Sequence, residues 1–129
     1  MWAEHDTKLE KARELIEKAV KSEPKNAAYL DSLGWVYYKQ NKIEDAEAAL
    51  RKAIEHEAHD PTIRSHMGDV YAKQGKMDQA ATEWEKSLSE WHRSLPGDVE
   101  SDKVAELEKK LGQAKHRVAQ KAPATDDKP

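Results

Sequence analysis

The chain repeats itself with a period of 34 residues, and this period constrains the fold more than any other feature of the sequence. A shift by that distance aligns identical residues at the following pairs of positions: Gly34/Gly68, Val36/Val70, Tyr37/Tyr71, Lys39/Lys73, Gln40/Gln74, Lys42/Lys76, Ala46/Ala80 and Lys52/Lys86. A fixed period of this length is typical of folds made of stacked, identical supersecondary units. We therefore expect a fold that presents an extended surface and encloses no large cavity.

The repeat also extends toward the N-terminus, where half a unit precedes the first complete one. The start of the chain matches the second half of that unit at the following pairs: Lys8/Lys42, Glu10/Glu44, Ala12/Ala46, Lys18/Lys52, Ala19/Ala53 and Glu23/Glu57. The predicted organisation is an orphan second helix at 4–22, followed by complete units at 27–60 and 61–94.

Each complete unit is predicted to be a hairpin of two helices. In the first unit the apolar and small residues recur at helical spacing in two groups: Leu30, Leu33, Gly34 and Tyr37, then Ile43, Ala46, Leu50, Ala53 and Ile54. Asn41 and Gly75 separate the two helices of each unit, and both residue types tolerate the left-handed conformation that ends a helix. Asn26 and Asp60 are predicted to be N-caps, with Pro61 just inside its helix.

Small residues mark the place where the two helices of a hairpin cross, because helices approach to about 8–9 Å only where no large side chain separates them. The motifs that contain them are Leu30-x₂-Leu33-Gly34-x₂-Tyr37 with Ala46-x₃-Leu50, and Arg64-x₂-Met67-Gly68-x₂-Tyr71 with Ala80-x₃-Trp84. This pattern resembles the tetratricopeptide repeat family, which reads W-x₂-L-G-x₂-Y, then A-x₃-F, then P over 34 residues. The half unit contributes Ala12-x₃-Ile16 and the closing Pro24.

The resemblance implies an all-α fold, a right-handed superhelical stack of antiparallel helical hairpins in which five helices precede a C-terminal capping helix. After residue 94 the repeat pattern stops, and Pro96-Gly97-Asp98 is a turn signal. An amphipathic stripe then predicts the capping helix over 99–121: Val104, Leu107, Leu111, Ala114 and Val118. Trp91 is expected to pack beneath this helix. We expect a single domain at 1–121 and a disordered tail at 122–129.

The helix at 4–22 lacks the first helix of its own hairpin. Part of its apolar stripe is therefore expected to face solvent, together with Trp2: Leu9, Ala12, Leu15, Ile16 and Ala19. One interpretation is that the chain is the C-terminal end of a longer array of repeats. The alternatives are that helix 4–22 serves as an N-terminal cap or pairs with a second copy in a homodimer.

The first helix of each hairpin also has a face that points away from the core, and in the family these faces line a concave groove. The residues expected there are Asp31, Trp35, Tyr38 and Lys39 in the first unit, and Ser65, Asp69 and Lys73 in the second, with Ser32 and His66 at the margin. Trp35 and Tyr38 are informative because the core already contains Leu33 and Tyr37 from the same helix. Aromatic anchors among charges are typical of peptide-binding surfaces. The alternative is that both aromatic residues pack on the preceding hairpin or on a neighbouring chain.

The function that we expect is non-catalytic: a module or scaffold that binds a peptide or a partner domain in this groove. Family members that grip a C-terminal carboxylate use Lys, Asn and Arg there, whereas this chain has Asp31, Trp35 and His66. The acidic and basic residues of the groove suggest a mixed or partly basic ligand segment. The alternative function is structural, with self-assembly into homo-oligomers through the exposed edge of helix 4–22.

Composition argues against several other classes of protein. The formal net charge is −3, with 22 Lys and Arg interspersed among 25 Asp and Glu, so no basic footprint for nucleic acid is expected. No apolar run approaches the length needed to insert into a membrane. The absence of cysteine excludes disulfides and thiol catalysis. We expect a soluble protein, cytoplasmic, or periplasmic if the chain belongs to a longer exported one.

Two histidine clusters are candidates for chemistry. His56, His59 and Asp60 have a spacing that suits a divalent metal, but solvated histidine at a helix C-terminus explains them better, and the sequence fixes no third ligand. His66 and Asp69 have the spacing of a base and the residue that orients it, but no nucleophile or phosphate loop accompanies them. We therefore expect no enzyme activity, no metal and no cofactor.

Overall fold

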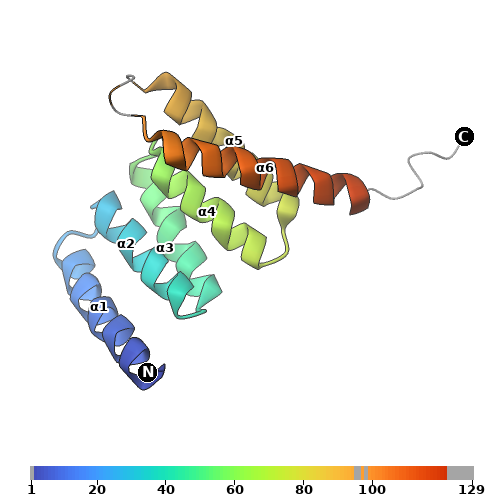
Figure 1. Ribbon diagram of the computed structural model, residues 1–129. Helices are drawn as coiled ribbons and strands as arrows, with labels where there is room; N and C mark the ends of the chain where they lie inside the picture. The colour runs from blue at the N-terminus through green and yellow to red at the C-terminus, as the bar shows by residue number, and fades with distance from the viewer. Residues whose placement is uncertain (1, 95–96, 98, 122–129) are drawn as a thin grey trace, which may run out of the picture.

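The computed structural model describes residues 2–94, 97 and 99–121, with side chains described over 7–94, 97 and 99–117. Within these residues the chain forms six α-helices, stacked side by side (Figure 1): α1 (Trp2–Ser22), α2 (Ala27–Lys39), α3 (Ile43–His56), α4 (Pro61–Lys73), α5 (Met77–Arg93) and α6 (Ser101–Lys121). The predicted all-α stack of hairpins is confirmed. Pro96 and Asp98 of the expected turn, the tail at 122–129 and the side chains of Trp2 and Val118 lie outside the described residues.

The caps that start α2 and α4 are those predicted. Asn26 Oδ1 accepts a hydrogen bond from the backbone N–H of Tyr29 at 3.0 Å. Asp60 Oδ1 accepts from the N–H groups of Thr62 and Ile63 at 2.8 and 3.2 Å. Each cap satisfies donors of the first helical turn, which have no partner within the helix.

The turn inside each hairpin is also the same in both units. Asn41 and Gly75 have positive φ angles of 63° and 78°, which confirms the expected left-handed conformation. The next residue then donates its N–H back across the turn, from Lys42 to the Tyr37 carbonyl at 2.8 Å, and the second unit has the equivalent bond at 2.9 Å. This pattern satisfies carbonyl groups at the helix end and sets the antiparallel return of the second helix.

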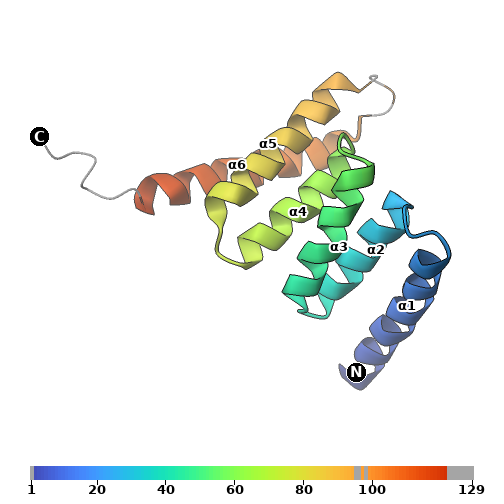
Figure 2. The ribbon, with the colours of Figure 1, turned by 180° about the vertical axis from the view of Figure 1, so that it is seen from behind.

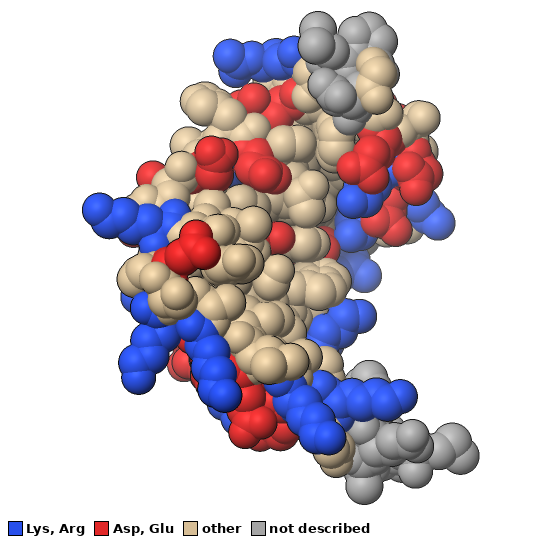
Figure 3. All heavy atoms as spheres, turned by 90° about the vertical axis from the view of Figure 1, so that its left-hand side faces the viewer, with Lys and Arg blue, Asp and Glu red and all other residues tan. Residues whose placement is uncertain are grey.

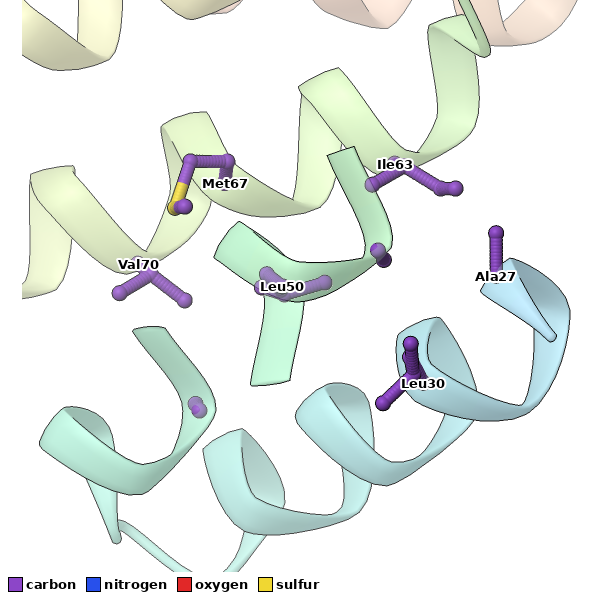
Figure 4. Close-up of a cluster of buried hydrophobic side chains, with 8 residues drawn as sticks. Ala27, Leu30, Leu50, Ile63, Met67 and Val70 are labelled. Atoms are coloured by element: carbon purple, nitrogen blue, oxygen red, sulfur yellow. The ribbon is translucent and has the colours of Figure 1, made fainter. Parts of the chain in front are cut away.

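The first core cluster lies between the two hairpins. Figure 4 shows Ile63, Met67 and Val70 of α4 pointing toward Leu50 of α3, with Leu30 of α2 on the other side of Leu50. Leu50 and Val70 have no exposed surface. The repeat therefore buries its apolar stripes between neighbouring units as well as within each hairpin, as expected for a stack.

The second core cluster lies under α6. Trp84, Trp91 and Leu107 pack together there and are each less than a tenth exposed. The prediction that Trp91 packs beneath the last helix is confirmed, and so is the core position of Trp84. The views from both sides show α6 crossing α5 at the end of the stack (Figure 2).

No described helix is both long enough and apolar enough to cross a membrane.

Candidate functional site

A hollow of about 290 Å³ lies between three helices, α2, α4 and α6, which correspond to the first helices of successive units. Its lining residues are Trp35 of α2; Thr62, Ser65, His66 and Asp69 of α4; Trp91 of α5; and Lys103, Glu106, Leu107 and Lys110 of α6. In the view of Figure 3 the outline of the molecule is hollowed on the right, below a group of acidic and basic side chains.

Three aromatic rings form a stack beside this hollow. The rings of Trp35 and Tyr38 lie 4.8 Å apart, centroid to centroid, and their planes differ by 4°. The imidazole of His66 stacks on the indole of Trp35, with centroids 4.2 Å apart and planes 22° apart. Trp35 therefore bridges its own hairpin and the following one, and its ring is held in one orientation before any ligand arrives.

A carboxylate also orients His66, through a hydrogen bond at the edge of its ring. His66 Nδ1 lies 2.7 Å from Asp31 Oδ1, and both side chains are about four-fifths buried. The carboxylate that pairs with His66 is therefore Asp31 and not Asp69, although Asp69 has the spacing of an orienting residue. Residues three apart on a helix share a face, but their side chains here turn toward different neighbouring helices, His66 toward α2 and Asp69 toward α6.

Asp69 is paired with the capping helix. Lys110 Nζ donates to Asp69 Oδ1 at 2.9 Å and also lies 5.8 Å from the centre of the Trp84 ring, where a cation is favourable. Because only 13% of the Asp69 side chain is exposed, this ion pair is partly shielded from water. It ties α6 to the floor of the hollow.

The family model for the tetratricopeptide repeat matches the chain twice, over residues 6–55 and 32–91. Together these matches cover about two thirds of the sequence. The chain belongs to the tetratricopeptide repeat family. No curated protein matches it at the level of sequence.

Solved tetratricopeptide structures share the architecture at low sequence identity. The crystal structure of PcrH in complex with the chaperone binding region of PopD has a TM-score of 0.78 at 15% identity, over 88% of this chain and 83% of that one. The translocator chaperone SycD of the Yersinia enterocolitica type III secretion system has a TM-score of 0.79 at 10% identity, with coverages of 89% and 77%. The first tetratricopeptide repeat domain of Spaghetti (RPAP3), bound to the HSP90 peptide SRMEEVD, has a TM-score of 0.75 at 16% identity, with coverages of 89% and 83%. Identities this low show a common fold, here the right-handed superhelical stack.

The structure places the predicted groove residues of this tetratricopeptide stack in three different settings. Trp35, Ser65, His66 and Asp69 line the hollow. Asp31 and Tyr38 lie behind it, as partners of His66 and Trp35. Lys39 and Lys73 are exposed in the last turns of α2 and α4, and Lys39 Nζ lies 5.5 Å from the centre of the Trp35 ring. His66, expected at the margin of the groove, is thus among the residues that line the hollow.

The contribution of α6 was not predicted, although the tetratricopeptide period contains a signal for it. One further step of 34 residues from Asp69 and Ala72 leads to Lys103 and Glu106, both of which line the hollow. The capping helix thus stands where the first helix of a third unit would stand, and it contributes side chains to the same concave face.

Burial affects the ionisation of one side chain in this tetratricopeptide groove, the phenol of Tyr38. The pKa of Tyr38 is raised, first by burial and then by the nearby negative charge of Asp69, while Lys110 acts in the opposite direction. The hydroxyl therefore stays protonated over the whole neutral range. It can donate a hydrogen bond but supplies no charge.

The charges of the groove are unequally available to a ligand. The carboxylates of Asp31 and Asp69 are mostly buried and already paired, with His66 and Lys110. Lys39, Lys73 and Lys103 are exposed. The acidic groups that suggested a basic ligand are thus occupied within the protein. The exposed charges are mixed, because Glu106 also lines the hollow and Lys103 Nζ lies 3.3 Å from the exposed Glu100.

In the second histidine cluster, His59 is hydrogen-bonded to Glu90 of α5. His59 Nδ1 lies 2.9 Å from Glu90 Oε2, and this hydrogen bond is the main cause of a lowered pKa of Glu90. Among the described residues, no three His, Cys, Asp or Glu side chains gather as metal ligands.

Proposed function

We propose that the chain is a non-catalytic module that binds an extended or helical peptide segment of a partner protein along the concave face of α2, α4 and α6. The observation that carries this proposal is the fixed aromatic stack of Trp35, Tyr38 and His66 beside an open hollow. An aromatic ring held in place loses little conformational entropy on binding, so it contributes more of its contact energy to affinity.

The chemistry of the lining favours a particular ligand. Trp35 of α2 offers apolar surface to the hollow, and Lys103 of α6 contributes an exposed ammonium whose surface partner is Glu100. We expect a segment that carries a large apolar side chain and at least one carboxylate. This differs from the mixed or partly basic segment that the groove residues suggested in the sequence, because Asp31 and Asp69 already have partners.

Proteins of the same fold support a peptide-binding role. PcrH is seen with the chaperone binding region of PopD, and the Spaghetti domain is seen with an HSP90 peptide. In each case a helical repeat of this size holds a segment of another protein. We extend that general role to this chain, and not the identity of either ligand.

The test uses peptides selected on the immobilised protein from a random library. The affinity of a selected peptide is measured by isothermal titration calorimetry for the wild type and for Trp35→Ala. Removal of a central aromatic anchor is expected to weaken binding about 30-fold. Far-UV circular dichroism should be unchanged, since the buried stripes of α2 remain. Unchanged affinity in a folded Trp35→Ala variant would refute the groove assignment.

A matched pair of charge reversals on α6 tests the ligand chemistry. Lys103→Glu changes the lining of the hollow, and Lys109→Glu makes the same change at an exposed position of α6 outside it. Acidic peptides should bind Lys103→Glu more weakly, by several-fold at low salt, and should bind Lys109→Glu like the wild type. Equal effects of the two reversals would mean that only net charge matters and would contradict a ligand seated on α6.

A second candidate function is self-assembly through α1, and the observation that favours it is the 67% exposure of Leu15. Large apolar side chains that stay this exposed are candidates for contact with another protein surface. The mass in solution, measured over a concentration series, tests this function independently of any peptide.

A further inference from the structure

The helix α1 carries an apolar stripe that stays partly open in the described structure. Ala12, Leu15, Ile16 and Ala19 follow the spacing i, i+3, i+4 and i+7, so they share one face of the helix. Leu15 is 67% exposed, and the other three side chains are only partly buried.

The equivalent positions in the complete hairpins are buried. Ala46, Leu50 and Ala53 stand one period after Ala12, Ile16 and Ala19, and none of the three has exposed surface. They are covered because α2 crosses them with Gly34 at the closest point, where an added Cβ would lie 2.7 Å from Leu50 Cγ. The stripe on α1 is therefore of the kind that another helix covers.

The neighbouring helix α2 does not provide that cover, because it packs on a different face of α1. The side of α1 that meets α2 carries Glu10 and Glu17, which accept hydrogen bonds from Gln40 Nε2 and the Tyr37 hydroxyl, each at 3.1 Å. The stripe lies a quarter turn or more around the helix from these residues. Its exposed side, at Leu15, is turned away from the stack, while the partly buried Ile16 lies one turn from Val20, which packs against the first core cluster.

The stripe is complementary to itself when read in the opposite direction. About a two-fold axis between Leu15 and Ile16, the antiparallel pairs are Leu15 with Ile16, Ala12 with Ala19 and Lys8 with Glu23. Lys8 and Glu23 are exposed, and the N–H of Glu23 still bonds to the Ala19 carbonyl at 2.9 Å, so the helical path reaches that residue. Small residues face small ones, large face large, and opposite charges meet at both ends.

We propose that this stripe binds the same stripe of a second copy, so that two α1 helices pack antiparallel about a two-fold axis. The proposal rests on the second candidate function and names its partner and register. The alanines permit a close approach of the two helices, while Leu15 and Ile16 fill the space on either side. Each Lys8 meets Glu23 of the other copy, and the symmetry makes this pair twice. Neither hollow is covered, so the dimer presents two peptide grooves.

The experiment is sedimentation velocity of the full chain over a range from about 1 μM to about 1 mM. The expected result is a reversible change from the monomer mass to twice that mass. A monomer throughout would overturn both the pairing and the second candidate function. A larger closed or open assembly would overturn the two-fold pairing.

Charge-reversal variants then test the register. Lys8→Glu brings two like-charge contacts into the proposed interface and should raise the dissociation constant about tenfold. The double variant Lys8→Glu with Glu23→Lys restores both pairs and should return the constant to near the wild-type value. Lys21→Glu makes the same reversal on the opposite side of α1 and serves as the matched control.

A steric variant completes the test. Ala12→Arg puts a long side chain at the closest approach and should abolish the dimer, while circular dichroism reports that the helices remain. A dimer that survives both Ala12→Arg and Lys8→Glu would overturn this pairing and leave self-assembly through another surface. Peptide affinity, measured on the same variants, reports on the groove separately.

Discussion

Replacement of Gly68 by alanine puts a methyl group where Trp84 already lies. A Cβ built on Gly68 would overlap Cδ1 and Nε1 of the Trp84 indole, and it would lie 3.0 Å from Cε2. The indole has little room to move away, since Trp84 is only 4% exposed and packs in the core under α6. The new methyl group must therefore push α4 and α5 apart.

Two opposing effects determine how much Gly68→Ala changes the free energy of unfolding. Alanine has a higher helix propensity than glycine, which stabilises a helix interior by about 1 kcal/mol. Overpacking of a filled core costs about 1–3 kcal/mol. The expected net result is a loss of up to about 2 kcal/mol in the free energy of unfolding.

Gly112 separates the two effects experimentally. It lies inside α6, and a Cβ built there meets nothing within 4 Å, so Gly112→Ala should show the propensity gain alone. Urea unfolding, followed by circular dichroism, measures both variants against the wild type. The two glycine-to-alanine changes should differ by about 1–3 kcal/mol, with opposite signs. A Gly68→Ala variant that is as stable as Gly112→Ala would refute the close crossing of α4 and α5.

Two further predictions concern individual hydrogen bonds. Ser87→Ala should destabilise the fold by about 1 kcal/mol in urea unfolding, because the fully buried Ser87 hydroxyl donates to the Pro61 carbonyl at 2.6 Å and the change removes this bond between α5 and α4. The carboxyl of Glu90 should titrate below 4.5 by NMR, because the hydrogen bond to His59 lowers its pKa, and His59→Ala should move the midpoint up. Since the folded-state pKa is the lower one, the stabilisation is present above pH 4.5 and is lost as the pH falls through the folded-state value.

The fold could be predicted from the sequence because its determinants are local. Asn26 and Asp60 cap helices through bonds to residues two or three positions away. Asn41 and Gly75 end helices through their own φ angles. Such interactions form wherever the same short motif occurs. Because the motif repeats every 34 residues, both units form the same caps and turns.

The contacts of the site depend instead on the rotation between units, which no short motif encodes. Asp31 meets His66, 35 residues away, and Asp69 meets Lys110, 41 residues away. Neither distance equals the period, because each side chain reaches diagonally toward the neighbouring helix. Spacing along one helix relates His66 only to residues of α4 such as Asp69, and it cannot indicate the partner on α2, Asp31.

One position of the repeat lies on the concave face and carries a different residue in each of the three helices. Trp35, Asp69 and Lys103 stand 34 residues apart in α2, α4 and α6, and all three line the hollow. Packing requires the neighbouring glycines to stay the same from unit to unit, but it places no such demand on a side chain that faces the groove. The central member is neutralised by Lys110, so a ligand meets an aromatic ring at one end and, at the other, an exposed ammonium whose surface partner is Glu100, at 3.3 Å. An apolar side chain toward α2 and a carboxylate toward α6 would satisfy both at once, and this orientation is the one that the Trp35→Ala and Lys103→Glu variants test.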